Sequence, residues 1–219
     1  KLEMEPVHSL GNGGGINEIF YSILMRNKTK EIIIGFSGTR NPEQLVYEIA
    51  QVYPVSYSIH PEVANAQVFD YFYVHYLNDF RDDLLGKVKN LTEKYQNYKL
   101  VFVGHSLGGS LTIHAAADVI LSGIAPKHDV YIFTYGQPRV GNKEFLDSFT
   151  SKVKEMYRVV HWRDLVAHVP PCVTDFSHGC VTDGMLPIYP LHPPQEIFYE
   201  ENCERWVECS PTNGEDPEC

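Results

Sequence analysis

The chain of 219 residues is 43% hydrophobic and 21% charged, which excludes a disordered or fibrous protein and suits one domain with a buried core. Its formal net charge of −10 argues against nucleic-acid partners and against anionic membranes, because both attract clustered Lys and Arg side chains. No apolar run approaches the roughly 18 residues that a bilayer-spanning helix needs.

Apolar and β-branched runs predict the strands. In chain order they lie at residues 18–24, 31–37, 98–103, 129–134 and 156–161, with shorter strands expected near 195–199 and 205–208. Several of these runs are too uniformly apolar for strands with one face in water. They favour a sheet that is covered on both faces.

Between the strands, apolar residues spaced three and four positions apart predict helices. One long helix is expected from Ala66 to Lys94, a second from Leu107 to Ser122, and a third that opens at Asn142. This alternation of strands and helices is typical of an α/β protein whose strands are joined by crossover helices.

The cysteines all lie in the last quarter of the chain. They are Cys172, Cys180, Cys203, Cys209 and Cys219, without the paired spacing that binds zinc. We therefore expect disulfides there, and the odd count implies a free thiol, an intermolecular bridge or a partner outside this stretch. Glycosylation sequons begin at Asn27 and Asn90. Together these features predict a secreted protein or one in a lysosome-like compartment.

A Gly-x-Ser-x-Gly motif, Gly104 to Gly108 around Ser106, follows the predicted strand at 98–103 and precedes a helix. In such a motif a sharp strand-to-helix turn exposes the serine hydroxyl, and only glycine tolerates the crowding two residues to either side. The start of the helix favours developing negative charge. The pattern predicts that Ser106 is a nucleophile. The alternatives are a structural serine in a glycine-rich turn and a phosphate-binding loop, which would need a Lys that is absent.

The strand-to-helix turn at Ser106 is called the nucleophile elbow. An acid partner is expected after a later strand, because enzymes with this elbow have the chain order serine, acid, histidine. Asp164 meets this condition, since it leaves the carboxyl end of the predicted strand at 156–161, the edge where α/β sites assemble. Asp175 and Asp183 lie further into an irregular tail rich in Pro, Gly and Cys.

Four segments together give the chain a resemblance to the fungal-type class 3 lipase family. They are IIIGFSGTR at 32–40, YKLVFVGHSLGGS at 98–110, YIFTYGQPRVGN at 131–142 and RVVHWRDLVAHVPP at 158–171. The resemblance covers most of residues 18–219. It implies an α/β-hydrolase fold with a mostly parallel central sheet and helices on both faces. We expect residues 1–219 to form a single domain of this fold.

The same resemblance implies roles for individual residues. Ser106 would be the nucleophile and Asp164 the acid, and the backbone N–H groups of Thr39 and Leu107 would form the oxyanion hole. Thr39 could instead cap the next helix. After it, the family places a short lid helix, for which residues 41–50 are suitable; the alternative is an ordinary surface helix.

The catalytic histidine is the unassigned member of the triad. The histidines after Asp164 are His168, His178 and His192. His168 is too close to the acid in sequence, and the other two resemble non-catalytic histidines of the family. The family's catalytic histidine follows a cysteine pair that Cys209 and Cys219 resemble. We therefore expect the chain to be part of a longer protein and to lack the N- and C-terminal segments of that protein. The catalytic base would then lie beyond Cys219, and His192 is the fallback candidate for the base.

These observations predict a serine esterase that hydrolyses lipid (acylglycerol) esters at a lipid–water interface and needs no metal or organic cofactor. Two alternatives remain. One is a catalytically inactive lipase-like protein with a binding or structural role, since a serine without a base is a weak nucleophile. The other is a different esterase of the same type, either a phospholipase A1 or a feruloyl-type esterase.

Overall fold

A computed structural model describes the fold. It covers residues 3–13, 18–39, 53–172, 174–175, 179–180, 190–212, 214–216 and 219. The predicted lid at 41–50 and the side chain of His178 lie outside the described residues.

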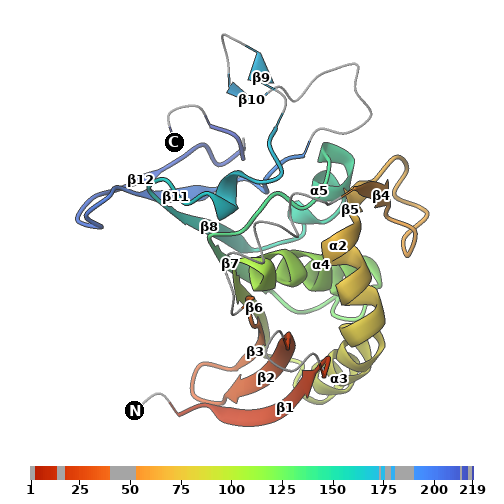
Figure 1. Ribbon diagram of the computed structural model, residues 1–219. Helices are drawn as coiled ribbons and strands as arrows, with labels where there is room; N and C mark the ends of the chain where they lie inside the picture. Colours follow the sequence, from red (N-terminus) through yellow and green to blue (C-terminus); the bar gives the residue numbers. More distant parts are fainter. Residues whose placement is uncertain are drawn as a thin grey trace.

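The centre of the molecule is an eight-stranded sheet in the order β1-β2-β3-β6-β7-β8-β11-β12 (Figure 1). Its strands are β1 (Glu5–Gly11), β2 (Phe20–Arg26), β3 (Glu31–Phe36), β6 (Lys99–His105), β7 (Val130–Tyr135), β8 (Glu155–His161), β11 (Glu196–Tyr199) and β12 (Trp206–Glu208). The five strands from β3 to β11 run parallel, and β1, β2 and β12 are antiparallel to their neighbours. The mostly parallel sheet is confirmed.

The strand β1 is absent from the sequence prediction. Its sequence, EPVHSLG, has no apolar run, and most of its residues are exposed or half-buried because it is an edge strand that pairs only with β2. Two small pairs complete the strands: β4 (Pro54–Ser56) with β5 (Gln67–Phe69), and β9 (Thr174–Asp175) with β10 (Gly179–Cys180).

The long helix predicted from Ala66 to Lys94 is wrong in its first turn and in its continuity. The structure has α2 (Asp70–His75), a π-helical turn (Tyr76–Phe80) and α3 (Arg81–Lys94). The preceding residues form β5, and Val68 also bridges to Gly141. Pairing with residues distant in sequence therefore overrides the local helical period.

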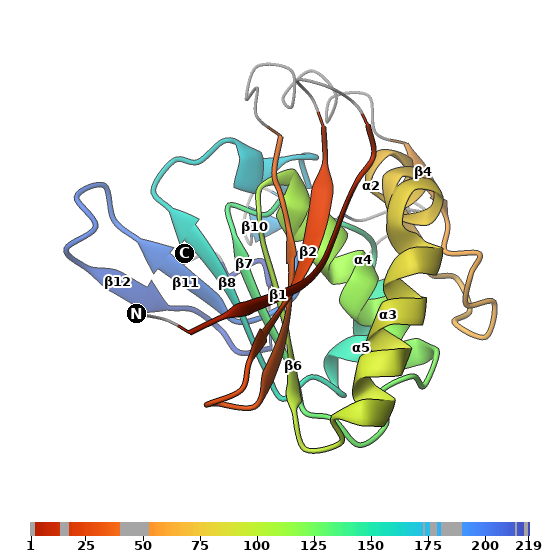
Figure 2. The ribbon, with the colours of Figure 1, turned by 90° about the horizontal axis from the view of Figure 1, so that it is seen from below.

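The described helices gather on one face of the sheet (Figure 2). The central helix α4 (Leu107–Leu121) packs on β3, β6 and β7, and it is surrounded by α2, α3 and α5 (Lys143–Thr150). Along the central strands, buried side chains alternate with half-buried ones. The α/β-hydrolase architecture is as expected, but within the described residues the helices cover one face rather than both.

A buried carboxylate connects the helical layer. Asp118 on α4 accepts hydrogen bonds of 2.7 Å from His60 Nε2, the Tyr76 hydroxyl and Arg81 Nε. Burial alone would raise the pKa of Asp118, but the hydrogen bonds from Tyr76, Arg81 and His60 lower it below its usual value. One ionised group thus joins α4 to the π-helical turn, to α3 and to the loop that carries His60.

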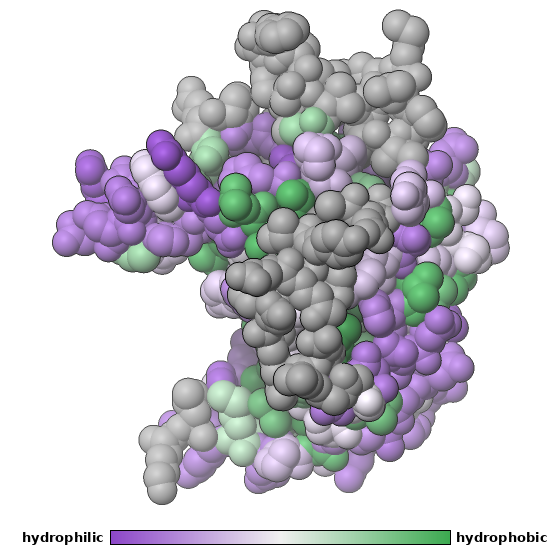
Figure 3. All heavy atoms as spheres, viewed as in Figure 1, coloured by the Kyte–Doolittle hydropathy of each residue, from purple (hydrophilic) through white to green (hydrophobic). Residues whose placement is uncertain are grey.

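The C-terminal region contains disulfides, as the cysteine pattern predicts. Cys209 pairs with Cys219, Cys172 is also disulfide-bonded, and Cys203 is an exposed free thiol. Cys203 lies in the β11–β12 hairpin, which projects from the body of the molecule with a hydrophilic surface (Figure 3). Among the described residues, no helix combines the length and the apolar character that crossing a bilayer requires.

Candidate active site

Ser106 occupies a strained turn between β6 and α4. Its backbone has φ 57° and ψ −127°, a region that non-glycine residues rarely adopt. Its N–H donates to the carbonyl of Tyr135 over 2.8 Å, and its own carbonyl accepts from the N–H of Gly109 over 2.9 Å. The sharp turn that the motif predicts is therefore present, and hydrogen bonds to β7 and within α4 hold it.

The glycines on either side of Ser106 are required by close packing. A Cβ atom at Gly104 would lie 2.2 Å from the carbonyl oxygen of Gly108. A Cβ atom at Gly108 would lie 2.4 Å from the carbonyl oxygen of Phe36, at the end of β3. Neither position can accommodate a side chain, so the elbow is pressed against both β3 and the first turn of α4.

Ser106 is less exposed than the sequence predicts. Only 5% of its surface is accessible. The turn after β3 covers it, since a Cβ atom on Gly38 would stand 3.5 Å from the Cβ of Ser106. The serine is therefore buried beneath the turn after β3 rather than lying on an open surface.

Two groups expected to bind an oxyanion lie beside the elbow. Thr39 follows Gly38, and its hydroxyl is buried without a hydrogen-bond partner among the described residues. Leu107 is the first residue of α4, where backbone N–H groups have no partner within the helix. We therefore expect a negatively charged oxygen next to Ser106 to accept hydrogen bonds from both groups.

Asp164 reaches the same edge of the sheet from β8. Its Oδ1 accepts a hydrogen bond of 2.9 Å from the N–H of Val166. Its Oδ2 lies over Gly136, where a Cβ atom would be only 2.6 Å away. Gly136 directly follows Tyr135, whose carbonyl holds the N–H of Ser106. The carboxyl end of β7 therefore separates Ser106 from Asp164 and contacts both.

The described histidines do not complete a triad. The fallback His192 is 5% exposed, and its Nε2 donates to the carbonyl of Ala167 over 2.7 Å rather than to Asp164. Burial, followed by the charges of Arg158 and Arg139, holds the pKa of His192 well below its usual value. His168 is exposed, and its Nδ1 donates to the backbone carbonyl of Asp164, not to the carboxylate.

The sequence reasoning did not identify two residues of this edge. Gly136 has a φ of +52° and provides the space for the Asp164 carboxylate. Arg139 is buried beside the loop that carries Asp164. Both belong to the quoted segment YIFTYGQPRVGN, but their importance depends on contacts with β8 that the sequence does not reveal. No group of His, Cys, Asp and Glu among the described residues is arranged to hold a metal ion.

Comparison with known proteins identifies the family of this chain. The family described as Lipase (class 3) matches residues 33–174. A lipase of Rhizomucor miehei is 32% identical over 152 residues, covering 68% of this chain and 40% of the relative. The secreted mono- and diacylglycerol lipase 1 of Fusarium solani is 42% identical over 81 residues, covering 37% of this chain and 23% of that enzyme.

The solved structures agree at the level of the fold. The Rhizomucor miehei lipase propeptide complex superimposes with a TM-score of 0.80 at 24% identity, covering 99% of this chain and 63% of that chain. The chain spans between 23% and 40% of the length of these curated relatives. With a family match over residues 33–174, more than half of the chain, and a strand-to-helix elbow at Ser106, the chain belongs to the class 3 lipase family.

Proposed function

We propose that this chain forms the core of a serine esterase that hydrolyses acylglycerol esters at a lipid–water interface. The observation that carries the proposal is the strained Ser106 elbow, which shares one sheet edge with the carboxylate of Asp164. Strain of this kind persists only where the surrounding structure imposes it, and it is concentrated at functional sites. The lipase relatives support the substrate class.

The mechanism begins with attack of Ser106 Oγ on the ester carbonyl carbon, while a histidine accepts the hydroxyl proton. The N–H groups of Leu107 and Thr39 then stabilise the oxyanion of the tetrahedral intermediate. Collapse of the intermediate expels the alcohol, which takes the proton from the histidine, and leaves an acyl group on Ser106. Water, activated by the same histidine, releases the fatty acid.

Asp164 would orient the imidazole and stabilise its protonated form. The Oδ1 atom is already engaged by Val166, so Oδ2, over Gly136, is the oxygen that would face the imidazole. We assign the imidazole to a histidine outside the described residues. His192 does not fill this role because Ala167 and burial hold it away from the acid.

A secretory location is part of the proposal. The Cys209–Cys219 disulfide requires an oxidising compartment, and both sequon asparagines, Asn27 and Asn90, are exposed. The Fusarium relative is named as a secreted enzyme.

The alternative of an inactive lipase-like protein rests on one observation. No described histidine bonds to the Asp164 carboxylate. In that case Ser106 would keep its proton and would not turn over esters.

A single substitution distinguishes the two functions. In the full-length protein, Ser106→Ala is expected to reduce ester hydrolysis by on the order of 10⁴-fold or more, because the nucleophile is lost. Ser110→Ala is the matched control, since Ser110 is a buried serine one turn further along α4 and its hydroxyl has no described partner. Rates would be measured on emulsified acylglycerol. Near-normal hydrolysis by the Ser106→Ala variant would refute the esterase assignment.

A further inference from the structure

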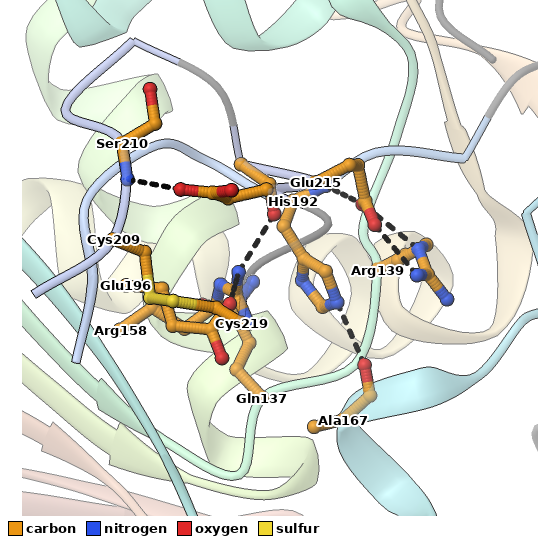
Figure 4. Close-up of polar contacts among 12 residues, drawn as sticks. Gln137, Arg139, Arg158, Ala167, His192, Glu196, Cys209, Ser210, Glu215 and Cys219 are labelled. Atoms are coloured by element: carbon orange, nitrogen blue, oxygen red, sulfur yellow. Dashed lines mark hydrogen bonds and ion pairs between the residues drawn. A yellow bond between two sulfur atoms is a disulfide. The ribbon is translucent and has the colours of Figure 1, made fainter. Parts of the chain in front are cut away.

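Arg139 is a buried arginine that contacts the loop carrying Asp164. Figure 4 shows its guanidinium facing Glu215. Its Nη1 donates to the carbonyl oxygens of His168 and Pro170 over 2.8 Å and 3.0 Å. Its backbone N–H donates to the carbonyl of Val169 over 2.9 Å. Arg139, in the segment that follows β7, therefore binds three successive carbonyl groups, those of residues 168–170, in the loop that follows β8.

Those carbonyl groups end a closed loop that begins at Asp164. The N–H of Val166 bonds to the carboxylate, and Nδ1 of His168 donates to the backbone carbonyl of Asp164 over 2.7 Å. The carbonyl of Ala167 in the middle of the loop is held by His192. Because the loop is bonded internally, displacement of its far end would also displace the carboxylate.

Glu215 fixes the other side of the Arg139 guanidinium. Arg139 Nε and Nη2 donate to Oε1 and Oε2 of Glu215 over 2.9 Å and 2.7 Å, a two-point contact that sets the plane of the guanidinium. Both side chains are almost fully buried. Glu215 Oε1 also accepts from the N–H of His192 over 2.9 Å. Glu215 lies in the segment closed by the disulfide between Cys209 and Cys219, which are 10 positions apart.

We propose that Arg139 and Glu215 form a clamp that positions Asp164 for the reaction. Arg139 is then a positioning residue, acting through the loop rather than on substrate, and the proposal rests on the proposed function of Ser106 and Asp164. The clamp couples the disulfide-closed segment to the catalytic acid. A misplacement of about 1 Å can reduce a catalytic rate by on the order of 10²-fold.

Loss of the clamp has a signature in the pH profile. A carboxylate close to an imidazole favours the protonated imidazole and raises its pKa. When the carboxylate moves away, the pKa of the catalytic imidazole falls, so the acidic limb of the activity profile moves to lower pH. A purely structural defect reduces the folded fraction but does not move this limb.

Arg158 provides a matched control. It is 2% exposed, forms an ion pair with Glu196 over 2.5 Å and donates to the carbonyl of Gly214 over 2.8 Å. None of the hydrogen bonds described for its side chain reaches residues 164–170. Arg158 thus resembles Arg139 in its burial, its charge and its ion pair with a glutamate, but it lacks the contact with the acid loop.

The experiment compares Arg139→Lys with Arg158→Lys in the full-length protein. Lysine keeps the charge but loses the planar fork. For Arg139→Lys we expect kcat for ester hydrolysis to fall roughly 10-fold to 100-fold with KM little changed. We expect the acidic limb of its pH profile to move down by roughly one pH unit. Arg158→Lys is expected to lower Tm without moving that limb.

Two results would overturn the clamp. One is an Arg139→Lys variant with an unmoved acidic limb. The other is an equal shift of the limb in both variants. If Arg139→Lys does not fold, Glu215→Gln carries the same test, because it removes the charge that orients the guanidinium. Ser106→Ala is measured in parallel. If this variant stays active, the proposed function is refuted, and the clamp with it. If it is inactive but the acidic limb of Arg139→Lys has not moved, the clamp alone is refuted.

Discussion

Gly136 is the residue whose missing side chain leaves space for the carboxylate of Asp164. Its φ of +52° suits glycine, and the Asp164 carboxylate occupies the space that a side chain would take. The residue therefore serves two purposes, a turn after β7 and a site for the acid. A sequence pattern identifies the glycine in the turn but not the carboxylate above it, because the contact joins residues from different strands.

A substitution separates the two purposes. Gly136→Ala is expected to lower kcat by on the order of 10²-fold, because the new Cβ atom would displace Asp164 Oδ2. Gly123→Ala is the control, since Gly123 also has a positive φ, of 64°, but no atom within 4 Å of the added Cβ. Both variants should lose stability, by roughly 1 kcal/mol. Equal kcat values for the two variants would show that the carboxylate does not depend on this space.

The helix α4 begins directly after the proposed nucleophile Ser106, and it also carries a buried histidine. His114, in the middle of the helix, is fully buried beside the rings of Tyr73, Tyr76 and Phe145. Neither ring nitrogen has a hydrogen-bond partner among the described residues. Burial lowers the pKa of His114 to about 3, against an opposing effect of Asp118.

This depressed pKa predicts a loss of stability in acid. The unfolded chain binds a proton at His114 near pH 6.5, whereas the folded protein does so only near pH 3. Above the unfolded pKa both states are neutral, so stability falls only as the pH drops below it, by roughly 1.4 kcal/mol per pH unit. His114→Leu should remove this slope, and urea unfolding between about pH 5 and pH 6.5 measures it.

The control for this experiment is His128→Leu, which alters a half-buried histidine in the segment between α4 and β7 and leaves His114 in place. The acid-dependent slope should persist in the control. A His114→Leu variant that retains the full slope would show that another group binds the proton.

At the scale of the whole molecule, the sequence predicts what is local. Uniform apolar runs locate β3, β6, β7 and β8, and the glycine spacing locates the elbow at Ser106. The position of Asp164 follows from the order of the parallel strands. The sequence does not predict β1 or the π-helical turn, since these depend on pairing and packing partners. It also does not predict the contacts of Arg139 with residues 168–170 and with Glu215, which lies 76 positions away.

The active-site proposal depends on several strands ending at one edge. The turn after β3 supplies Thr39, the end of β6 supplies Ser106, the end of β7 supplies Gly136, and the loop after β8 supplies Asp164. We infer that this assembly makes Ser106 more reactive than any other serine of the chain.

Mass spectrometry of the full-length protein after treatment with a fluorophosphonate measures the reactivity of Ser106. A fluorophosphonate forms a covalent adduct with an activated serine and leaves ordinary serine hydroxyl groups unmodified. We predict an adduct on the peptide that contains Ser106, and labelling slowed by on the order of 10⁴-fold in Asp164→Asn. An unlabelled protein, or an adduct on a different serine, would show that Ser106 is not an activated nucleophile.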